Sequence, residues 1–578
     1  MEPLRLLVNR VLDRLSMDSP GEATLELLTE VLNSYPILLT GAQSERLLSR
    51  LTAPESQKRY HAIIEGDDDF ELVSFGNLLL NFADVNHERL IQDAGINSQL
   101  LLSMVRDLLS AKGCPVLEDR LFVPAIEFWS TFAETLADEM LSEDNETPKP
   151  WAQQALSHVV CAVSHAWQRL VYPSQAEVAA WDSNDRVSFQ EARKDVVDLL
   201  QATFALVGPQ VVTTFSELTL EAIENHMWMR AEAALFCLAG LSDCARDDTR
   251  CDDTLATVFA SPLFSIIQTH GSELTPRLRQ VSVSLIEKYT DYFERNTTHL
   301  PAALQLLFSV VGEPAISTSA ARSIQRLCSS CRHHLHSEVE AFLTMYSQVV
   351  SGRGLDCTAS ERIIGAIASV VQAIEDETYR DQICSRLLEV VKDDADRAAT
   401  MLKTSGSAPL PCAGSPRCFA ESEESAQMHV TMRALKSLSN IGKGFKALAD
   451  GPVDVDQATS LEPSLGPSSY ANQSRILSML TEIPSVIGMT SGIAELTCHV
   501  LRSGFAESSP GPFVFAAQDV VGFLTQYGTT TPGIGHFVST GCSFLNSLKR
   551  NQVEENQHAM IVILQWVVSL LSKLEGMT

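Results

Sequence analysis

Apolar residues recur along this chain at the three- and four-residue spacing of amphipathic helices, and strand-like alternation is rare. Near the N-terminus, Leu4, Leu7, Val11, Leu12 and Leu15 form one such stripe. No run rich in Val, Ile and Thr alternates with polar residues around an Asn-Gly or Asp-Gly turn. The pattern therefore predicts an all-α protein.

Similar stripes recur farther along, and some end at residues that terminate helices. We expect helices around four apolar sets: Val196, Leu200, Phe204 and Val207; Met229, Ala233, Phe236 and Gly240; Ile324, Cys328, Cys331 and Leu335; and Ile476, Leu480 and Ile483. Gly208 is expected to end the first of these helices, because glycine favours the C-terminal cap. Pro484 is expected to end the last, because proline lacks the backbone N–H that a helix needs.

The length of the chain favours a repeat architecture over one globular bundle. Single hydrophobic cores stop growing at about 250–300 residues, and this chain has 578. Paired amphipathic helices joined by short polar breaks are typical of HEAT and armadillo repeats of about 40–47 residues, of which the chain would hold roughly 13. We therefore predict a HEAT/armadillo-like α-solenoid, a superhelix of antiparallel helix pairs.

Two stretches rich in Ser, Pro and Gly interrupt the helical pattern. Residues 404–425 and 450–472 are expected to be flexible loops. They divide the chain into a HEAT-repeat arc at residues 1–403, a helix at 426–449 and C-terminal HEAT-like helices at 473–578.

The charge of the chain narrows the choice of partners. Asp and Glu number 72 against 43 Lys and Arg, which gives a net charge of −29. This excess disfavours nucleic acid and anionic membrane surfaces, and makes basic proteins the natural partners. The most apolar stretch, residues 560–571, is shorter than the about 20 residues that cross a bilayer. The first 16 residues lack the apolar core of a signal peptide, so we expect an intracellular protein without membrane insertion.

One short motif could suggest metal chemistry. Cys328 and Cys331 form a CxxC pair that is followed by His333, His334 and His336, and such ligands can hold zinc. Both cysteines lie on an apolar stripe, however, and no second pair follows at finger-like spacing, so buried thiols are the preferred interpretation. P-loop, GxSxG and HExxH motifs are absent from the sequence. We therefore predict no enzymatic activity, no catalytic residues, no metal and no cofactor.

Acidic runs are the candidate partner-binding residues. They comprise Asp67, Asp68, Asp69 and Glu71 before one expected helix, and Asp247, Asp248, Asp252 and Asp253 between two others. Solenoid loops can present such carboxylates to Lys and Arg of a partner, which helps association rate and specificity. Solvated loops and favourable placement at a helix N-terminus would explain the same residues, so both interpretations stay open for the group.

Tryptophans are concentrated in the first arc, at Trp129, Trp151, Trp167, Trp181 and Trp228. Exposed tryptophans could anchor a partner. Their helical spacing beside leucines favours a place in the core.

Several segments resemble the importin-β superfamily of nuclear transport receptors, in the importin-13 and transportin-3 branch. Residues 172–200 are similar to the family's aromatic-Pro-Ser, acidic, Trp, acidic, Phe-x-x-x-Arg helix entry. Residues 75–93, 227–243, 283–300 and 322–335 look like family helices in the same order, with the importin-13 side closer. This collinear order over about residues 75–375 is more specific than any one motif.

The resemblance implies a HEAT-repeat superhelix that carries protein cargo through nuclear pores, with Ran-GTP controlling loading and release. It implies basic or folded protein cargo, the Ran GTPase and nuclear pore proteins as partners, and shuttling between nucleus and cytoplasm. Family members are longer, and Met1 aligns inside them, after the N-terminal repeats that carry the main Ran-GTP contact. The alternative function is a HEAT-repeat scaffold that assembles protein complexes without a transport cycle.

Overall fold

A computed structural model describes most of the chain in nine stretches. These are residues 2–15, 21–141, 149–269, 274–351, 355–403, 426–446, 467–507, 510–548 and 554–575. The regular secondary structure of these stretches is helical throughout, apart from one isolated bridge between Pro115 and Asp119. The prediction of an all-α protein is confirmed.

The chain divides into two compact units. Unit 1 contains Met1–Leu263 and Ser272–Lys288, and unit 2 contains Phe264–Gly271 and Tyr289–Thr578. No pattern in the sequence indicates a division near residue 288, because the helices on both sides of it share the same amphipathic pattern.

The α-helices of unit 1 are α1 (Glu2–Arg14), α2 (Glu22–Ser34), α3 (Gly41–Leu51), α4 (Pro54–Ile64), α5 (Phe70–Val85), α6 (His87–Gln92), α7 (Ile96–Asp107), α8 (Phe122–Leu141), α9 (Ala152–Gln168), α10 (Gln175–Ala180), α11 (Ser183–Val207), α12 (Gln210–Glu224), α13 (Trp228–Gly240), α14 (Ser242–Ala245), α15 (Asp252–Phe259) and α17 (Pro276–Lys288). Short 3-10 helices are η1 (Pro36–Leu38), η2 (Leu108–Ser110) and η3 (Thr249–Cys251). Between α15 and α17 lies α16 (Leu263–Thr269), most of which belongs to unit 2.

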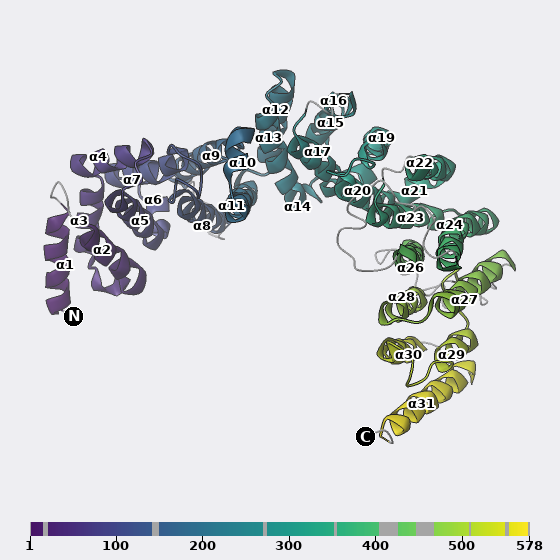
Figure 1. The fold of residues 1–578 in the computed structure, drawn as a ribbon. Coiled ribbons are helices and arrows are strands. Elements are labelled where there is room, and N and C mark those ends of the chain that lie inside the picture. Colours follow the sequence, from purple (N-terminus) through teal and green to yellow (C-terminus); the bar gives the residue numbers. More distant parts are fainter. Residues whose placement is uncertain are drawn as a thin grey trace. The chain divides into compact units, whose positions relative to one another are not determined.

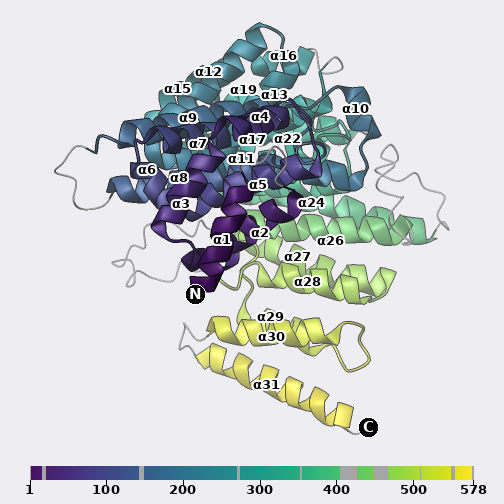
Figure 2. The ribbon, with the colours of Figure 1, turned by 90° about the vertical axis from the view of Figure 1, so that its left-hand side faces the viewer.

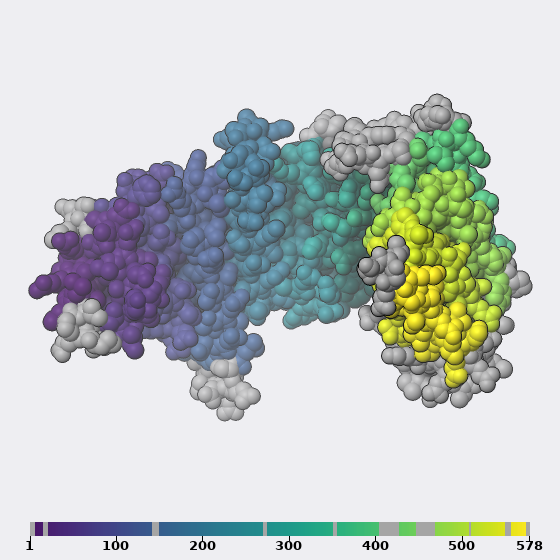
Figure 3. Space-filling view, turned by 60° about the horizontal axis from the view of Figure 1, so that its bottom comes forward, coloured from purple at the N-terminus to yellow at the C-terminus, as the bar shows by residue number. Residues whose placement is uncertain are grey.

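Helices of unit 1 are stacked in two rows. In one row α2, α5, α8, α11, α13 and α17 each pack against the next. The second row includes α3, α7 and α9, which also pack in succession, and α12 with α15 (Figure 1). Contacts between α5 and α7, α8 and α9, and α12 and α13 join the rows. In the space-filling view the purple-to-blue part of the chain, which contains unit 1, is a continuously packed body (Figure 3).

The α-helices of unit 2 are α18 (Thr290–Arg295), α19 (Leu300–Val310), α20 (Ser317–Ser330), α21 (Arg332–Leu335), α22 (Val339–Ser351), α23 (Cys357–Gln372), α24 (Glu377–Lys403), α26 (Ala426–Gly444), α27 (Pro467–Ile487), α28 (Ser491–Arg502), α29 (Ala517–Thr525), α30 (Ile534–Leu548) and α31 (Glu554–Glu575). Its 3-10 helices are η4 (Thr297–His299) and η5 (His336–Glu338).

Unit 2 has the same two-row construction. Helices α20, α23, α26, α28 and α30 pack in succession in one row. In the second row α24 packs against α27, and α29 packs against α31. The green-to-yellow helices are seen stacked one above another in a second view (Figure 2). Both units are therefore built as α-solenoids, as the sequence predicted.

Side-chain hydrogen bonds disclose the length of the repeat. Bonds that join one helix pair to the next recur at a separation of 39 residues: Arg193 to Glu232, Gln201 to Gly240, Arg433 to Asp394, and Trp566 to Tyr527. Corresponding positions of successive repeats are neighbours in a solenoid. The spacing therefore confirms the repeat architecture, with a period just below the expected range of about 40–47 residues.

The two expected helix stops have opposite outcomes. Helix α11 ends at Val207, and Gly208 caps it with φ 62° and an N–H that donates to the Phe204 carbonyl at 2.8 Å. The expectation for Pro484 is wrong, because α27 continues through it to Ile487. The proline lies in the last turn, where its missing N–H removes only one helical hydrogen bond. The N–H of Gly488 then donates to the Pro484 carbonyl at 3.0 Å.

Other predicted segment boundaries, and one predicted apolar stripe, differ in part from the structure. Helix α26 lies within the helix expected at 426–449. Residues 404–425 and 450–466 lie outside the described part of the chain, whereas 467–472 are helical in α27 and not part of a loop. Of the predicted N-terminal stripe, Leu4 lies outside the side chains that the structure describes, Leu12 and Leu15 are buried, and Leu7 is 51% exposed, whereas the adjacent Val8 is buried.

Among the described helices, none combines the length and the apolar character needed to cross a membrane.

Candidate partner-binding surfaces

The first predicted acidic run lies at the N-terminus of α5. A carboxylate oxygen of Asp69 caps this helix by accepting a hydrogen bond from the Glu71 N–H at 2.9 Å. Asp67 accepts one from the Asp69 N–H at 3.2 Å. Asp67, Asp68 and Asp69 are exposed, and Glu71 is half-buried. The run therefore stabilises the start of a helix and also places carboxylates at the surface.

The second predicted run joins α14 to α15. Asp248 caps η3, accepting from the Arg250 N–H at 3.1 Å, and pairs with the Arg250 guanidinium at 2.7 Å. The hydrogen bond with Arg250 lowers the pKa of Asp248. Asp252 and Asp253 lie in the first turn of α15, where carboxylates suit the helix dipole. Asp247 and Asp253 are exposed, whereas Asp248 and Asp252 are half-buried.

A third acidic surface, which the sequence analysis missed, spans α8 and α11. Burial raises the pKa of Asp195. The nearby charges of Asp198, Glu127 and Glu191 raise it further, and Lys194 opposes them. Asp198, Glu127 and Glu191 are exposed. We call these four carboxylates (Glu127, Glu191, Asp195 and Asp198) the α8–α11 acidic face.

Part of this face could have been found from the sequence. Glu191, Asp195 and Asp198 follow the i, i+4, i+7 spacing of one helix face. Glu127 joins them only because α8 packs against α11. That packing brings like charges together, which is an arrangement suited to a basic partner.

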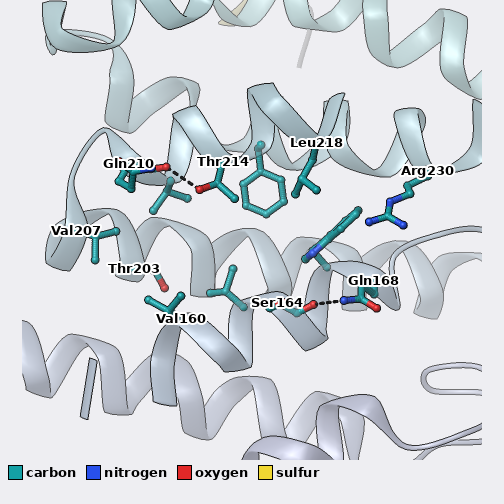
Figure 4. A pocket seen from close by; sticks show the side chains of 13 residues that line it. Val160, Ser164, Gln168, Thr203, Val207, Gln210, Thr214, Leu218 and Arg230 are labelled. Atoms are coloured by element: carbon teal, nitrogen blue, oxygen red, sulfur yellow. Dashed lines mark hydrogen bonds between the residues drawn. The ribbon is translucent and has the colours of Figure 1, made fainter. Parts of the chain in front are cut away.

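Unit 1 also carries an apolar groove of about 380 Å³ between α9 and α12. Its walls include Val160 and Trp167 of α9, Val207 of α11, and Phe215 and Leu218 of α12 (Figure 4). The Trp167 and Phe215 rings meet edge to face with centroids 6.0 Å apart. Trp167 is 4% exposed, so the side chain that the sequence assigned to the core also lines a surface groove.

Polar groups of the groove make hydrogen bonds within their own helices. The Thr214 hydroxyl donates to the Gln210 carbonyl at 2.9 Å, and the Gln168 side-chain amide donates to the Ser164 carbonyl at 2.9 Å (Figure 4). At one end the Arg230 guanidinium lies 5.0 Å from the centre of the Trp167 ring. The walls that face the groove are therefore mainly apolar.

The CxxC pair is part of the core of unit 2. Cys328 and Cys331 are both 0% exposed. Burial raises the pKa of both thiols, that of Cys331 to about 12. The neighbouring His333, His334 and His336 are exposed. In the part of the chain that the structure describes, no group of three or more His, Cys, Asp or Glu side chains is arranged to hold a metal ion.

Comparison with protein families finds one match. Residues 255–345 match the family model described as the Transportin-3/Importin-13 third TPR domain. This segment covers α16 to α20 and includes the Cys328–Cys331 pair.

Curated relatives agree with this match. The importin beta-like protein kap111 of Schizosaccharomyces pombe is 23% identical over 531 residues, which are 90% of this chain and 50% of kap111. Human importin-13 is 21% identical over 258 residues, which are 43% of this chain and 25% of that protein. The chain spans about half the length, or less, of the curated relatives it matches.

Solved structures show the same fold. A structure described as importin-13 in its cytosolic state superposes with a TM-score of 0.74 at 14% identity, covering 100% of this chain and 63% of the other. A crystal structure of importin-β gives a TM-score of 0.53 at 12% identity, covering 97% of this chain and 64% of the other. The family match and the similarity to kap111 and importin-13 support a place in the importin-β superfamily, on its importin-13 branch, and the solved structures show the same fold.

Proposed function

We propose that this chain acts as a nucleocytoplasmic transport receptor that binds protein cargo. The observation that carries the proposal is the similarity to kap111 along 90% of the chain. In this role the protein shuttles between nucleus and cytoplasm, and Ran-GTP controls the loading and release of cargo.

Cargo binding is assigned to the acidic surfaces of unit 1. Asp68 in the first run and Asp247 in the second are exposed and lie outside the helix-capping contacts. Asp67, Asp69 and Asp248 contribute to the same negative field while also accepting backbone hydrogen bonds in their loops. Glu71, Asp252 and Asp253 contribute to it from the first turns of α5 and α15. The α8–α11 acidic face adds four more carboxylates. A field of one sign attracts basic cargo and accelerates its association.

The apolar groove suits a second class of partner, the nuclear pore proteins. A receptor that crosses the pore needs brief contacts with pore proteins, and a shallow apolar groove can bind one apolar or aromatic side chain at a time. The Trp167–Phe215 wall offers such a side chain an edge-to-face contact.

Binding to Ran tests the proposed transport cycle. The purified chain is titrated with Ran loaded with a non-hydrolysable GTP analogue, and with GDP-loaded Ran as control. Selective binding of the GTP form is expected. Binding that ignores the nucleotide, or no binding, would contradict control by Ran and favour the scaffold function.

Charge reversal tests the cargo surface. Glu191→Lys/Asp198→Lys is expected to weaken binding of a folded basic probe such as lysozyme several-fold at low salt, and to flatten the salt dependence of binding. The matched control, Asp393→Lys/Asp396→Lys, makes the same charge change at exposed positions of α24 in unit 2. Equal losses in both variants would show that only net charge matters, and would contradict a dedicated surface.

A paired substitution tests the groove. Val160→Asp places a charge in the groove. The control, Val187→Asp, introduces the same charge on α11 outside the groove. The two valines are similarly exposed, at 48% and 52%. In permeabilised cells we expect the labelled Val160→Asp protein to accumulate less at the nuclear envelope than the control. Equal accumulation would count against the groove as the contact with pore proteins.

A further inference from the structure

A nucleophilic side chain lies on α9, on the side of the helix that meets α7. Cys161 and His165 are one helical turn apart, and Sγ of Cys161 lies 3.9 Å from Nε2 of His165. The other ring nitrogen, Nδ1, lies 3.7 Å from a carboxylate oxygen of Asp107, at the end of α7. The three residues thus form the order thiol, imidazole, carboxylate, in which the base faces the thiol and the carboxylate faces the base.

The carboxylate is held in place by other groups. Nε of Arg106 donates to Asp107 at 2.7 Å, and the Tyr60 hydroxyl is also hydrogen-bonded to it. Nδ1 of His165 is buried and makes no hydrogen bond within the described residues. Its nearest anionic contact is Asp107, which would stabilise the imidazolium that forms when His165 takes a proton.

A cation also faces the thiol. Burial alone would lower the pKa of Arg106, but the hydrogen bond and charge of Asp107 and the charge of a Cys161 thiolate raise it. Cys161 is half-buried, so it is accessible to a small reagent. Partial exposure in an electropositive surrounding is the setting in which cysteines are reactive.

Among the described cysteines, Cys357 also contacts an imidazole, with its Sγ 3.2 Å from Nε2 of His429, but this thiol is buried. Burial raises the pKa of Cys498 to about 11, and burial with the Glu118 charge raises that of Cys114 to about 11. Cys542 is exposed, and it provides an accessible thiol for comparison within the same chain.

We propose that Cys161 is a nucleophilic thiol and that a hydroperoxide oxidises it to a sulfenic acid. The thiol proton moves to Nε2 of His165. The sulfur attacks one peroxide oxygen, an S–O bond forms and the O–O bond breaks. The departing oxygen takes the proton from His165 and leaves as water when the oxidant is hydrogen peroxide, or as an alcohol when it is an organic hydroperoxide. The sulfur loses two electrons and the peroxide gains them.

Competition between thiols tests the nucleophile. The folded chain is treated at neutral pH with a limiting amount of iodoacetamide, and alkylation of each cysteine is measured by peptide mass spectrometry. Cys161 is expected to react about tenfold faster than Cys542, despite its lower exposure. In urea the two rates should converge, because the arrangement around Cys161 is lost. Equal rates in the folded chain would overturn the proposal.

Variants separate the mechanism from simple accessibility. His165→Asn should bring the Cys161 rate down to about that of Cys542, while His333→Asn, at an exposed histidine of unit 2, should leave it unchanged. Circular dichroism checks that both variants are folded. With hydrogen peroxide and dimedone, the sulfenic acid label should appear first on Cys161. Labelling of Cys542 before Cys161, or a Cys161 alkylation rate that survives His165→Asn, would overturn the proposal.

Discussion

Arg193 and Glu232 form a buried ion pair inside unit 1. One guanidinium nitrogen of Arg193 donates to both carboxylate oxygens of Glu232, at 3.0 and 2.9 Å. The residues are 3% and 5% exposed. The guanidinium also lies 4.1 Å from the centre of the Phe236 ring and 4.6 Å from that of Tyr172. This pair joins α11 to α13 and, through Tyr172, to the segment before α10.

Removal of one partner of this pair should destabilise unit 1 strongly. Glu232→Ala leaves the Arg193 charge buried and unpaired, and we expect a loss of about 3–5 kcal/mol in the free energy of unfolding. The measurement is urea unfolding followed by circular dichroism. Hydrogen exchange should accelerate in α11 and α13 and remain unchanged in α24 and α26 of unit 2.

A surface pair provides the control for this change. Arg246 and Asp243 also form an ion pair, at 2.7 Å, but both side chains are more than half exposed. Asp243→Ala should therefore change the free energy of unfolding by less than about 1 kcal/mol. A loss at Asp243 as large as that at Glu232 would contradict the importance of burial.

The Arg193–Glu232 pair also shows what the sequence could not predict. Amphipathic spacing identified the helices and their pairing into repeats, because each helix buries one stripe. Two buried ions 39 residues apart have no periodic signal of their own. Likewise, adjacent apolar residues in α1 leave the choice between Leu7 and Val8 to packing against α2 and α3, and the structure buries Val8.

His158 should make the stability of unit 1 sensitive to acid. Burial, with the Arg106 charge, lowers the pKa of His158 from 6.5 to about 4. The unfolded chain therefore binds a proton at this site between those values and the folded chain does not, so stability is complete above about pH 6.5 and declines as pH falls towards about 4.

The pH effect is checked by urea midpoints at about pH 7 and about pH 5. The wild-type midpoint should fall between them, and His158→Gln should reduce the fall. His61→Gln, which changes an exposed histidine of α4, is the control and should behave like wild type. An unchanged fall in His158→Gln would contradict the assignment to this histidine.

Gly208 should resist substitution because of its backbone conformation. Its φ of 62° is one that residues with a Cβ rarely adopt. No steric obstacle accompanies it, since an added Cβ would have only the Arg250 guanidinium nearby, at 3.9 Å. Gly208→Ala is thus expected to cost about 1–2 kcal/mol through strain at the α11 cap.

Gly312 is the matched control for this cost. It has no positive φ, and an added Cβ would meet nothing within 4 Å. Gly312→Ala should be neutral or slightly stabilising, because alanine restricts the unfolded chain. Thermal unfolding of both variants measures the difference. Equal midpoints would show that φ at Gly208 relaxes at little cost.

The candidate surfaces differ in how far the sequence could predict them. Consecutive acidic residues in a loop can be seen in the sequence, so Asp67 and Asp247 could be named directly as candidate partner-binding residues. The α8–α11 acidic face needs Glu127 beside Asp195, and only helix packing supplies that neighbour. The groove is equally hidden, because Trp167 and Phe215 belong to stripes that predict nothing more than a core.

Finally, chelation should leave unit 2 unaffected. Cys328 and Cys331 are fully buried, and burial holds both thiols in their protonated form, which is a poor metal ligand. We expect the urea midpoint to be the same with and without EDTA. Cys328→Ser, by contrast, should cost about 1–3 kcal/mol, because it places a hydroxyl in an apolar site. A urea midpoint that falls with EDTA, together with stoichiometric zinc in the purified protein, would contradict the assignment of Cys328 and Cys331 as buried core thiols. It would instead favour metal binding by the CxxC pair.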